Sequence, residues 1–216
     1  MKRLIIISML MFTYGCTTID PYTGEQKTSK AAAGAGIGAI AGAVIGAATS
    51  SKKDRDKGIL TGAVAGAAAG GGIGYYMDRQ ETKLREELQG SGVQVRREGN
   101  TIHLVMPGNI TFETSRYEIK SEFYSVLNSV AKVLAEFKET SIKVSGHTDS
   151  TGSMALNQTL SEQRADSVRQ YLIQRDVAGG RVHAYGYGPR YPVESNSSAS
   201  GRQQNRRVEL KLEPLE

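Results

Sequence analysis

The chain has 216 residues, a formal net charge of +5, three histidines and one cysteine. This length allows one domain of ordinary size with additional segments. The small positive charge and the lack of a base-stacking aromatic pattern give no indication of nucleic-acid binding. One cysteine without repeated Cys/His spacing gives no metal site, and no cofactor is indicated.

The first fifteen residues, 1–15, predict a cleaved signal peptide. Lys2 and Arg3 precede a short apolar run, Leu4 to Phe12, which is too short to span a bilayer comfortably. With Cys16 just beyond it, the segment resembles the bacterial lipoprotein signal, in which this cysteine becomes the lipidated N-terminus. Because Thr17 and not Asp follows, the resemblance implies the outer membrane, with the later domain in the periplasm. An ordinary signal peptide with an incidental cysteine is the alternative.

Residues 16–30 form a polar, turn-rich spacer, after which the composition changes abruptly. In residues 31–77, glycine recurs at every fourth position through two Ala-rich segments, and a polar, basic turn separates them. This duplicated glycine zipper predicts a helical hairpin in which two backbones approach closely. The zipper positions are Gly34, Gly38, Gly42, Gly46, Gly58, Gly62, Gly66, Gly70 and Gly74.

Two interpretations of this hairpin remain open. In the first, segments of roughly 19 residues reach across the ~30 Å core of a bilayer as two transmembrane helices, and the chain is a multi-pass inner-membrane protein. In the second, the hairpins self-associate into a homo-oligomer or lie on the membrane surface, because Ala and Gly contribute little hydrophobicity. The charged segment that follows, 78–91, predicts a solvated connector helix.

Residues 92–216 predict an α/β two-layer sandwich, in which helices pack on a mixed sheet in βαβαβ order. Two alternating segments around a glycine turn indicate a hairpin, and a change of period to about 3.6 indicates helices between the later strands. The predicted strands are 93–97, 101–106, 142–147, 181–187 and 207–212, and the predicted helices are 123–137, 156–174 and part of 197–204.

Two opposite charges stand close to the start of the helix at 156–174. Asp149 lies in the glycine-containing loop before it. Arg164 interrupts an i, i+4 apolar line that predicts packing on the sheet, and the line consists of Leu156, Leu160, Val168 and Leu172. A fixed anion and a fixed cation at one cleft suit a ligand with an ammonium and a carboxylate. An internal Asp149–Arg164 salt bridge, or an Arg164 that reaches water along its stem, is the alternative.

The motif Thr148-Asp149-x-x-Gly152-x-x-x-x-Asn157-x-x-Leu160-Ser161-x-x-Arg164-Ala165, followed by Asn205-Arg206-Arg207-Val208-Glu209, resembles the OmpA C-terminal-like peptidoglycan-binding domain over roughly 93–213. The resemblance implies that Asp149 binds the ammonium of the stem-peptide diaminopimelate and that Arg164 binds its carboxylate. It also implies that Asn157, Arg207 and Thr148 belong to the pocket. Ser115 stands where the family carries a longer amide that contacts the ligand.

These features predict a non-enzymatic, lipid-anchored envelope protein that binds peptidoglycan noncovalently and supports envelope integrity. One alternative is a structural or outer-membrane assembly factor built on the glycine zipper. Another is a cell-wall hydrolase, which requires a nucleophile–base pair, a metal triad or facing carboxylates. Asp149 beside Arg164 should have a lowered pKa, which is unfavourable for a general acid.

Overall fold

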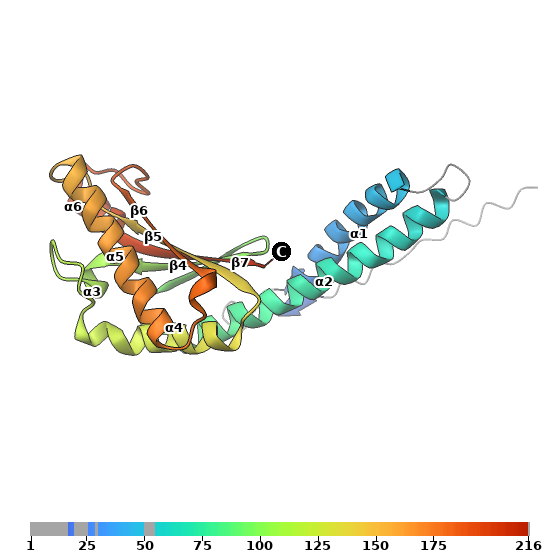
Figure 1. Cartoon of the computed structure of the whole chain (residues 1–216), viewed down its shortest axis with the longest axis horizontal. Helices are drawn as coiled ribbons and strands as arrows, with labels where there is room; N and C mark the ends of the chain where they lie inside the picture. The colour runs from blue at the N-terminus through green and yellow to red at the C-terminus, as the bar shows by residue number, and fades with distance from the viewer. Residues whose placement is uncertain (1–16, 20–25, 29, 50–54, 216) are drawn as a thin grey trace, which may run out of the picture. The chain divides into compact units, whose positions relative to one another are not determined.

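The structure, a computed structural model, describes residues 17–19, 26–28, 30–49 and 55–215. It consists of two units, Met1–Gly74 and Tyr75–Glu216 (Figure 1). The predicted signal peptide at 1–15, the lipidation site Cys16 and most of the basic turn lie outside the described residues.

The N-terminal unit contains a small antiparallel pair of strands and a helical hairpin. Strand β1 (Thr17–Ile19) pairs with β2 (Gln26–Thr28), and α1 (Lys30–Thr49) packs against the first part of α2 (Arg55–Glu87). A Cβ atom at Gly38 would overlap the carbonyl oxygen of Gly66, and one at Gly42 would overlap that of Gly62. The close backbone approach predicted from the four-residue spacing is therefore confirmed at these central glycines.

The large apolar side chains of α1 point away from the glycine contact. Ile37, Ile40, Val44 and Ile45 are between 63% and 71% exposed. Within the described ranges, no helix combines the length and apolar character needed to cross a membrane. The interpretation of the hairpin as two transmembrane helices is therefore not supported, because Gly and Ala dilute the hydrophobicity of both segments.

The C-terminal unit is built on a five-stranded mixed sheet with the order β3-β4-β7-β5-β6. Strands β5 and β6 pair in parallel, whereas the β3–β4 hairpin and both neighbours of β7 are antiparallel. The mixed sheet predicted from the sequence is thus confirmed. Its strands are β3 (Gln94–Glu98), β4 (Thr101–Pro107), β5 (Thr140–His147), β6 (Val182–Gly188) and β7 (Arg207–Pro214).

Helices α4 (Tyr124–Glu136) and α5 (Met154–Gln174) lie on the same side of this sheet (Figure 1). The short elements are α3 (Gly108–Thr111), η1 (Ser121–Phe123), η2 (Gly179–Arg181) and α6 (Ala199–Asn205). The core between the layers confirms the two-layer sandwich. The sheet contributes to it Ile102, Leu104, Met106, Ile142, Val144, Val208, Leu210 and Leu212, and the two helices contribute Leu127, Val130, Leu134, Val168 and Leu172.

The segment 78–91 is helical as far as Glu87, as predicted, but the prediction that it is a solvated connector is wrong, because one face of it is buried in the core of the C-terminal unit. Met77, Gln80 and Leu84 are completely buried, and Gln80 Nε2 donates a hydrogen bond to Thr140 Oγ1 at 3.3 Å. Their spacing of three and four residues forms one narrow buried stripe, which charged residues on the other faces conceal in the sequence.

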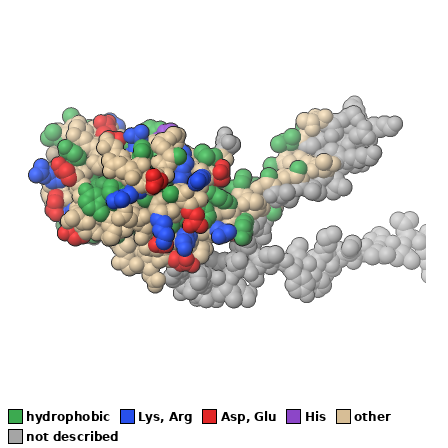
Figure 2. All heavy atoms as spheres, turned by 60° about the horizontal axis from the view of Figure 1, so that its bottom comes forward, with side chains coloured by type: hydrophobic (Ala, Val, Ile, Leu, Met, Phe, Trp, Pro, Cys, Tyr) green, Lys and Arg blue, Asp and Glu red, His purple; other side chains and the backbone are tan. Residues whose placement is uncertain are grey.

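Surface charges of both signs intermix on the face of the C-terminal unit shown in Figure 2. On α2, Arg85 pairs with Glu81 at 2.8 Å, and Lys132 of α4 reaches Glu87 of α2 at 2.7 Å. Exposed pairs of this kind contribute little to stability, because solvent screens their charges. The buried stripe of α2 is therefore the main source of its attachment to the unit.

Helix α5 departs from its predicted apolar line at the N-terminal end. Leu156 is 70% exposed, and the prediction that it packs on the sheet is wrong. The buried face of the first three turns instead carries Asn157, Ser161 and Arg164. This polar face is directed toward the loop after β5, so that Asn157 and Arg164 line the same pocket as Thr148 and Asp149.

Candidate functional site

The site forms where β5 ends and α5 begins. Thr148 N donates to Gly188 O of β6 at 3.0 Å, and Ser153 caps α5 by accepting a hydrogen bond from Leu156 N at 3.2 Å. Gly152 has a φ of 89°, which glycine adopts without the penalty of a side chain. The loop is therefore fixed at both ends, and its polar side chains have defined positions.

Two glycines bring α5 against the sheet at this point. A Cβ atom on Gly146 of β5 would overlap the carbonyl oxygen of Ser161, and one on Gly186 of β6 would overlap Glu162. The hydroxyl of Ser161 accepts a hydrogen bond from Gly188 N at 2.9 Å. This close contact sets the distance between the Asp149 loop and the side chains of α5.

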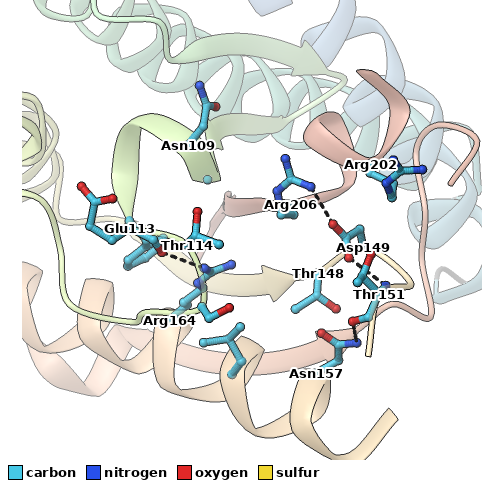
Figure 3. A pocket seen from close by; sticks show the side chains of 14 residues that line it. Asn109, Glu113, Thr114, Thr148, Asp149, Thr151, Asn157, Arg164, Arg202 and Arg206 are labelled. Atoms are coloured by element: carbon cyan, nitrogen blue, oxygen red, sulfur yellow. Dashed lines mark hydrogen bonds and ion pairs between the residues drawn. The ribbon is translucent and has the colours of Figure 1, made fainter. Parts of the chain in front are cut away.

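A pocket of ≈ 400 Å³ opens beside the loop (Figure 3). Asp149 and Arg206 meet on one side of it, Arg164 extends from α5 on the opposite side, and Thr148 lies between them. The lining comprises Gly108, Asn109, Phe112, Glu113, Thr114, Ser115, Thr148, Asp149, Thr151, Asn157, Leu160, Arg164, Arg202 and Arg206.

Asp149 is 7% exposed and already has an arginine partner. Its Oδ2 accepts a hydrogen bond from Arg206 Nη1 at 2.6 Å, and its Oδ1 accepts one from Thr151 N at 2.8 Å. Burial opposes ionisation, but these bonds outweigh it and hold the pKa of Asp149 below its ordinary value. The side chain is therefore a carboxylate at neutral pH.

Arg164 is 4% exposed and, among the described residues, pairs with no carboxylate. Its Nε donates to Arg116 O at 2.9 Å and its Nη2 to Glu113 O at 3.4 Å, while the guanidinium carbon lies 5.0 Å from the centre of the Phe112 ring. Burial and then the charge of Arg206 lower the pKa of Arg164, whereas Asp149 raises it. The internal Asp149–Arg164 salt bridge does not form, because Arg206 occupies Asp149.

The comparisons with known proteins follow the same division of the chain. Residues 111–206 match the OmpA family, and residues 1–78 match the YMGG-like Gly-zipper family. The chain is 52% identical over 210 residues to the probable lipoprotein YiaD of Escherichia coli, with 97% of this chain and 95% of YiaD covered. The chain belongs to the OmpA family. It is YiaD-like over nearly its whole length, including the glycine zipper.

Other similarities cover a smaller part of the chain. The peptidoglycan-binding protein ArfA of Mycobacterium tuberculosis is 38% identical over 111 residues, which cover 51% of this chain and 34% of ArfA. The structure of the cell wall anchor of the T6SS from Pseudomonas aeruginosa is 27% identical with a TM-score of 0.58, over 64% of this chain and 99% of that chain. A MotB-like protein from Desulfovibrio vulgaris shares the fold at 23% identity and a TM-score of 0.60, over 67% of this chain and 93% of that chain.

Five of the six residues expected in the OmpA-family pocket line the cavity, namely Asp149, Arg164, Asn157, Thr148 and Ser115. Asn157 Nδ2 donates to Thr151 O at 2.8 Å and so supports the loop. Thr148 Oγ1 is buried and has no hydrogen-bond partner in the described part of the chain. Ser115 is exposed and has a φ of 57°, a left-handed conformation that the amide-bearing Asn adopts more readily.

Arg207 does not line this cavity, contrary to the expectation. It is buried on the other face of the sheet, where its Nε donates to Glu209 at 2.6 Å and its Nη2 to Tyr191 O at 3.3 Å. The alternation of β7 correctly places Arg207 away from the core, but the pocket lies at the strand end and not on that outer face. Arg206, one residue earlier, reaches the pocket instead.

The Asn205-Arg206-Arg207 triplet of this OmpA-family chain therefore has three separate structural roles. Asn205 is fully buried, and its Oδ1 accepts hydrogen bonds from Val193 N at 2.8 Å and Glu194 N at 3.0 Å. Arg206 pairs with Asp149, and Arg207 bonds to Glu209 and Tyr191 on the outer face of the sheet. Arg206 and Arg202 are two pocket arginines that were not predicted as site residues from the sequence, and their spacing of four residues was the available signal.

His147 lies at the end of β5 and stacks on Tyr187 at a centroid distance of 5.4 Å. Burial lowers its pKa to about 4, the charges of Arg207 and Lys143 act in the same direction, and Glu209 opposes them. The imidazole is therefore neutral at pH 7. No group of three or more His, Cys, Asp or Glu side chains suited to a metal occurs among the described residues.

Proposed function

We propose that the C-terminal unit binds peptidoglycan noncovalently through the diaminopimelate of the stem peptide. We also propose that a lipid at Cys16 holds the chain at the outer membrane, so that it links the membrane to the cell wall. The observation that carries the proposal is Arg164, a buried guanidinium that lies beside a pocket and has no carboxylate partner among the described residues. Membership in the OmpA family and the printed descriptions of ArfA and the T6SS anchor support it.

A buried arginine cannot remove its charge by deprotonation, so it requires an anionic or strongly polar partner. The two carbonyl oxygens that Arg164 contacts compensate it only in part. Its Nη1 makes no hydrogen bond among the described residues, although the side chain lines the cavity. A ligand carboxylate in the cavity would complete the ion pair in a well-shielded position.

Asp149 supplies the complementary charge for a ligand ammonium. An ionised carboxylate offers about four lone-pair positions, of which Arg206 and Thr151 use two. Thr148, whose hydroxyl has no hydrogen-bond partner in the described part of the chain, lies between Asp149 and Arg164 and can bond either ligand group. Diaminopimelate carries an ammonium and a carboxylate on the same carbon, which matches this pair of charges. The lowered pKa suits Asp149 to cation binding and not to proton donation.

A site of this kind gives modest affinity, because a charge-assisted hydrogen bond contributes about 1.5–3 kcal/mol. Lipid anchoring at Cys16 would compensate for this weakness. It keeps the domain beside the wall and raises its effective concentration toward the mM range. Modest intrinsic affinity is then sufficient for stable attachment, while individual contacts can still exchange.

The direct test is sedimentation of the full-length protein with purified sacculi. We expect Asp149→Asn and Arg164→Gln to abolish co-sedimentation, and free meso-diaminopimelate to compete with the unaltered protein. Arg190→Gln is the charge-matched control, because Arg190 is exposed and does not line the cavity. Retention of binding by both site variants would disprove the assignment of the pocket. Asp149→Asn also keeps the shape of the side chain, which limits any effect on folding.

The outward apolar face of α1 favours a second role, self-association of the glycine-zipper hairpin. Ile37, Ile40 and Val44 follow the spacing of three and four residues that pairs helices in coiled coils, and exposed Ile45 lies next to Val44. We expect Ile40→Lys with Val44→Lys to lower the mass of the full-length protein in analytical ultracentrifugation while sacculus binding persists. An unchanged mass would argue against a homo-oligomer.

A further inference from the structure

The cavity of the proposed peptidoglycan site contains more positive than negative charge. Three arginines line it, Arg164, Arg202 and Arg206, together with two acids, Asp149 and Glu113. Glu113 is mostly exposed and pairs at 3.1 Å with Lys120, which is not part of the lining. Asp149 is therefore the carboxylate that balances three guanidiniums, and a zwitterionic ligand with one ammonium and one carboxylate leaves the excess positive charge in place.

The excess positive charge matters most at Arg206. Its partner, Asp149, is also the carboxylate that the ligand ammonium would bind. Its Nη1 lies 2.6 Å from Asp149 Oδ2. An ammonium that approaches Asp149 shares or replaces this ion pair, and a cation that loses its partner in a partly buried position is destabilised. The arginine side chain is 39% exposed, so it has room to turn toward another anion.

Arg202 lies four residues before Arg206 and lines the same end of the cavity. Its Nη1 donates to Asn196 O at 2.8 Å and to Ser197 O at 3.2 Å, which fixes the guanidinium. Its remaining donors have no partner among the described residues. Arg206 likewise has donors beyond Nη1 that bond to none of the described residues, and two such guanidiniums at one end of a cavity form a receptor for a carboxylate.

We propose that Arg202 and Arg206 form a second anion position, and that the site selects stem peptides with a further free carboxylate beyond the ammonium–carboxylate pair of diaminopimelate. This inference rests on the proposed function and adds a specificity to it. A stem peptide offers two groups with the required chemistry. One is the α-carboxylate of the γ-linked glutamate, and the other is the peptide-side carboxylate of a diaminopimelate that ends the stem.

Titration calorimetry on the full-length protein can separate these sources. The reference ligand is N-acetyl-L-alanyl-γ-D-glutamyl-meso-diaminopimelate, and two derivatives carry an amide in place of either the glutamate α-carboxylate or the peptide-side carboxylate. We expect one amidation to raise Kd about tenfold or more, because it removes a charge-assisted contact. The other amidation should have little effect, and the sensitive group identifies the carboxylate that is bound.

Two variants test whether Arg202 and Arg206 cause the difference in Kd between the reference ligand and the sensitive amide. Arg202→Gln should bind the reference ligand and the sensitive amide with similar Kd. Arg206→Gln should weaken the reference ligand but tighten the sensitive amide, because Asp149 becomes free for the ammonium. Arg190→Gln should retain the discrimination of the unaltered protein. Equal Kd values for all three ligands, or a difference that persists in both site variants, would overturn the second anion position. If none of the ligands binds, the proposed function itself is wrong.

Discussion

Replacing Gly146 by Ala should destabilise the C-terminal unit and weaken ligand binding together. The added Cβ would overlap the carbonyl oxygen of Ser161, with the carbonyl carbon at 2.9 Å and the Cα at 3.2 Å. These are backbone atoms of α5, so no flexible side chain can move aside, and the helix must shift from β5. Overpacking of this kind costs about 1–3 kcal/mol, and we expect about 3 kcal/mol because the obstacle is backbone.

The magnitude can be converted to a melting temperature. Unfolding entropy is about 2.1 cal/mol/K per residue, so a unit of about 140 residues has about 0.3 kcal/mol/K. A loss of about 3 kcal/mol then lowers the Tm by about 10 °C. Differential scanning calorimetry measures this change directly in the full-length protein.

The matched control is Gly180→Ala, because a Cβ atom at Gly180 has no neighbour within 4 Å. Its Tm should change by less than about 2 °C. In Gly146→Ala, sacculus binding at a temperature well below the Tm should also decrease, since Arg164 and Asn157 move with α5. Equal Tm values for the two variants, or undiminished binding by a destabilised Gly146→Ala protein, would refute the view that this contact sets the site geometry.

Three further predictions concern other parts of the chain. Because the pKa of His147, about 4, lies below the unfolded value of about 6.5, stability is lost as pH falls below about 6.5, by about 2 kcal/mol at pH 5. In urea unfolding, His147→Gln should therefore lose less stability between pH 7.5 and 5 than the unaltered protein. Asp176→Gly should raise the Tm by about 3 °C, because Asp176 has a φ of 66° after the end of α5. Gly42→Leu should increase amide hydrogen exchange in α1 and preserve sacculus binding, whereas Gly36→Leu, with nothing within 4 Å of its Cβ, should leave exchange unchanged.

The fold was predictable where local patterns and global packing agree. The five strands and the helices at α4 and α5 follow from alternation and from the 3.6-residue period, since each element buries one face. The Asp149 loop was predictable for the same reason, because a strand end followed by glycine and a capped helix has few alternative geometries. Asp149 and Arg164 were therefore found as opposite charges at one pocket, although their mutual distance was not determined by the sequence.

The partner of Asp149 was not predictable, because it depends on contacts between distant segments. Arg164 and Arg206 both lie within reach of the loop, and only the entry of β7 into the sheet places Arg206 on Asp149. The same limit explains why Arg207 was wrongly expected in the pocket. The alternation of β7 shows that Arg207 does not face the core, but it does not distinguish the outer face of the sheet from a pocket at the end of the strand. Periodicity assigns a residue to a face, whereas the neighbours of that face come from the tertiary structure.

The burial of α2 in the C-terminal unit changes how the wall-binding domain should be defined. Met77 and Leu84 are completely buried, and Glu139 N donates to the hydroxyl of Tyr76 at 2.9 Å. A fragment that begins near residue 90 would expose this apolar face of the core, so its failure to bind sacculi would be uninformative. The helix that carries the second half of the glycine zipper is also a core element of the sandwich. Replacements in its buried stripe should therefore destabilise the peptidoglycan-binding unit even though they lie far from the pocket in sequence.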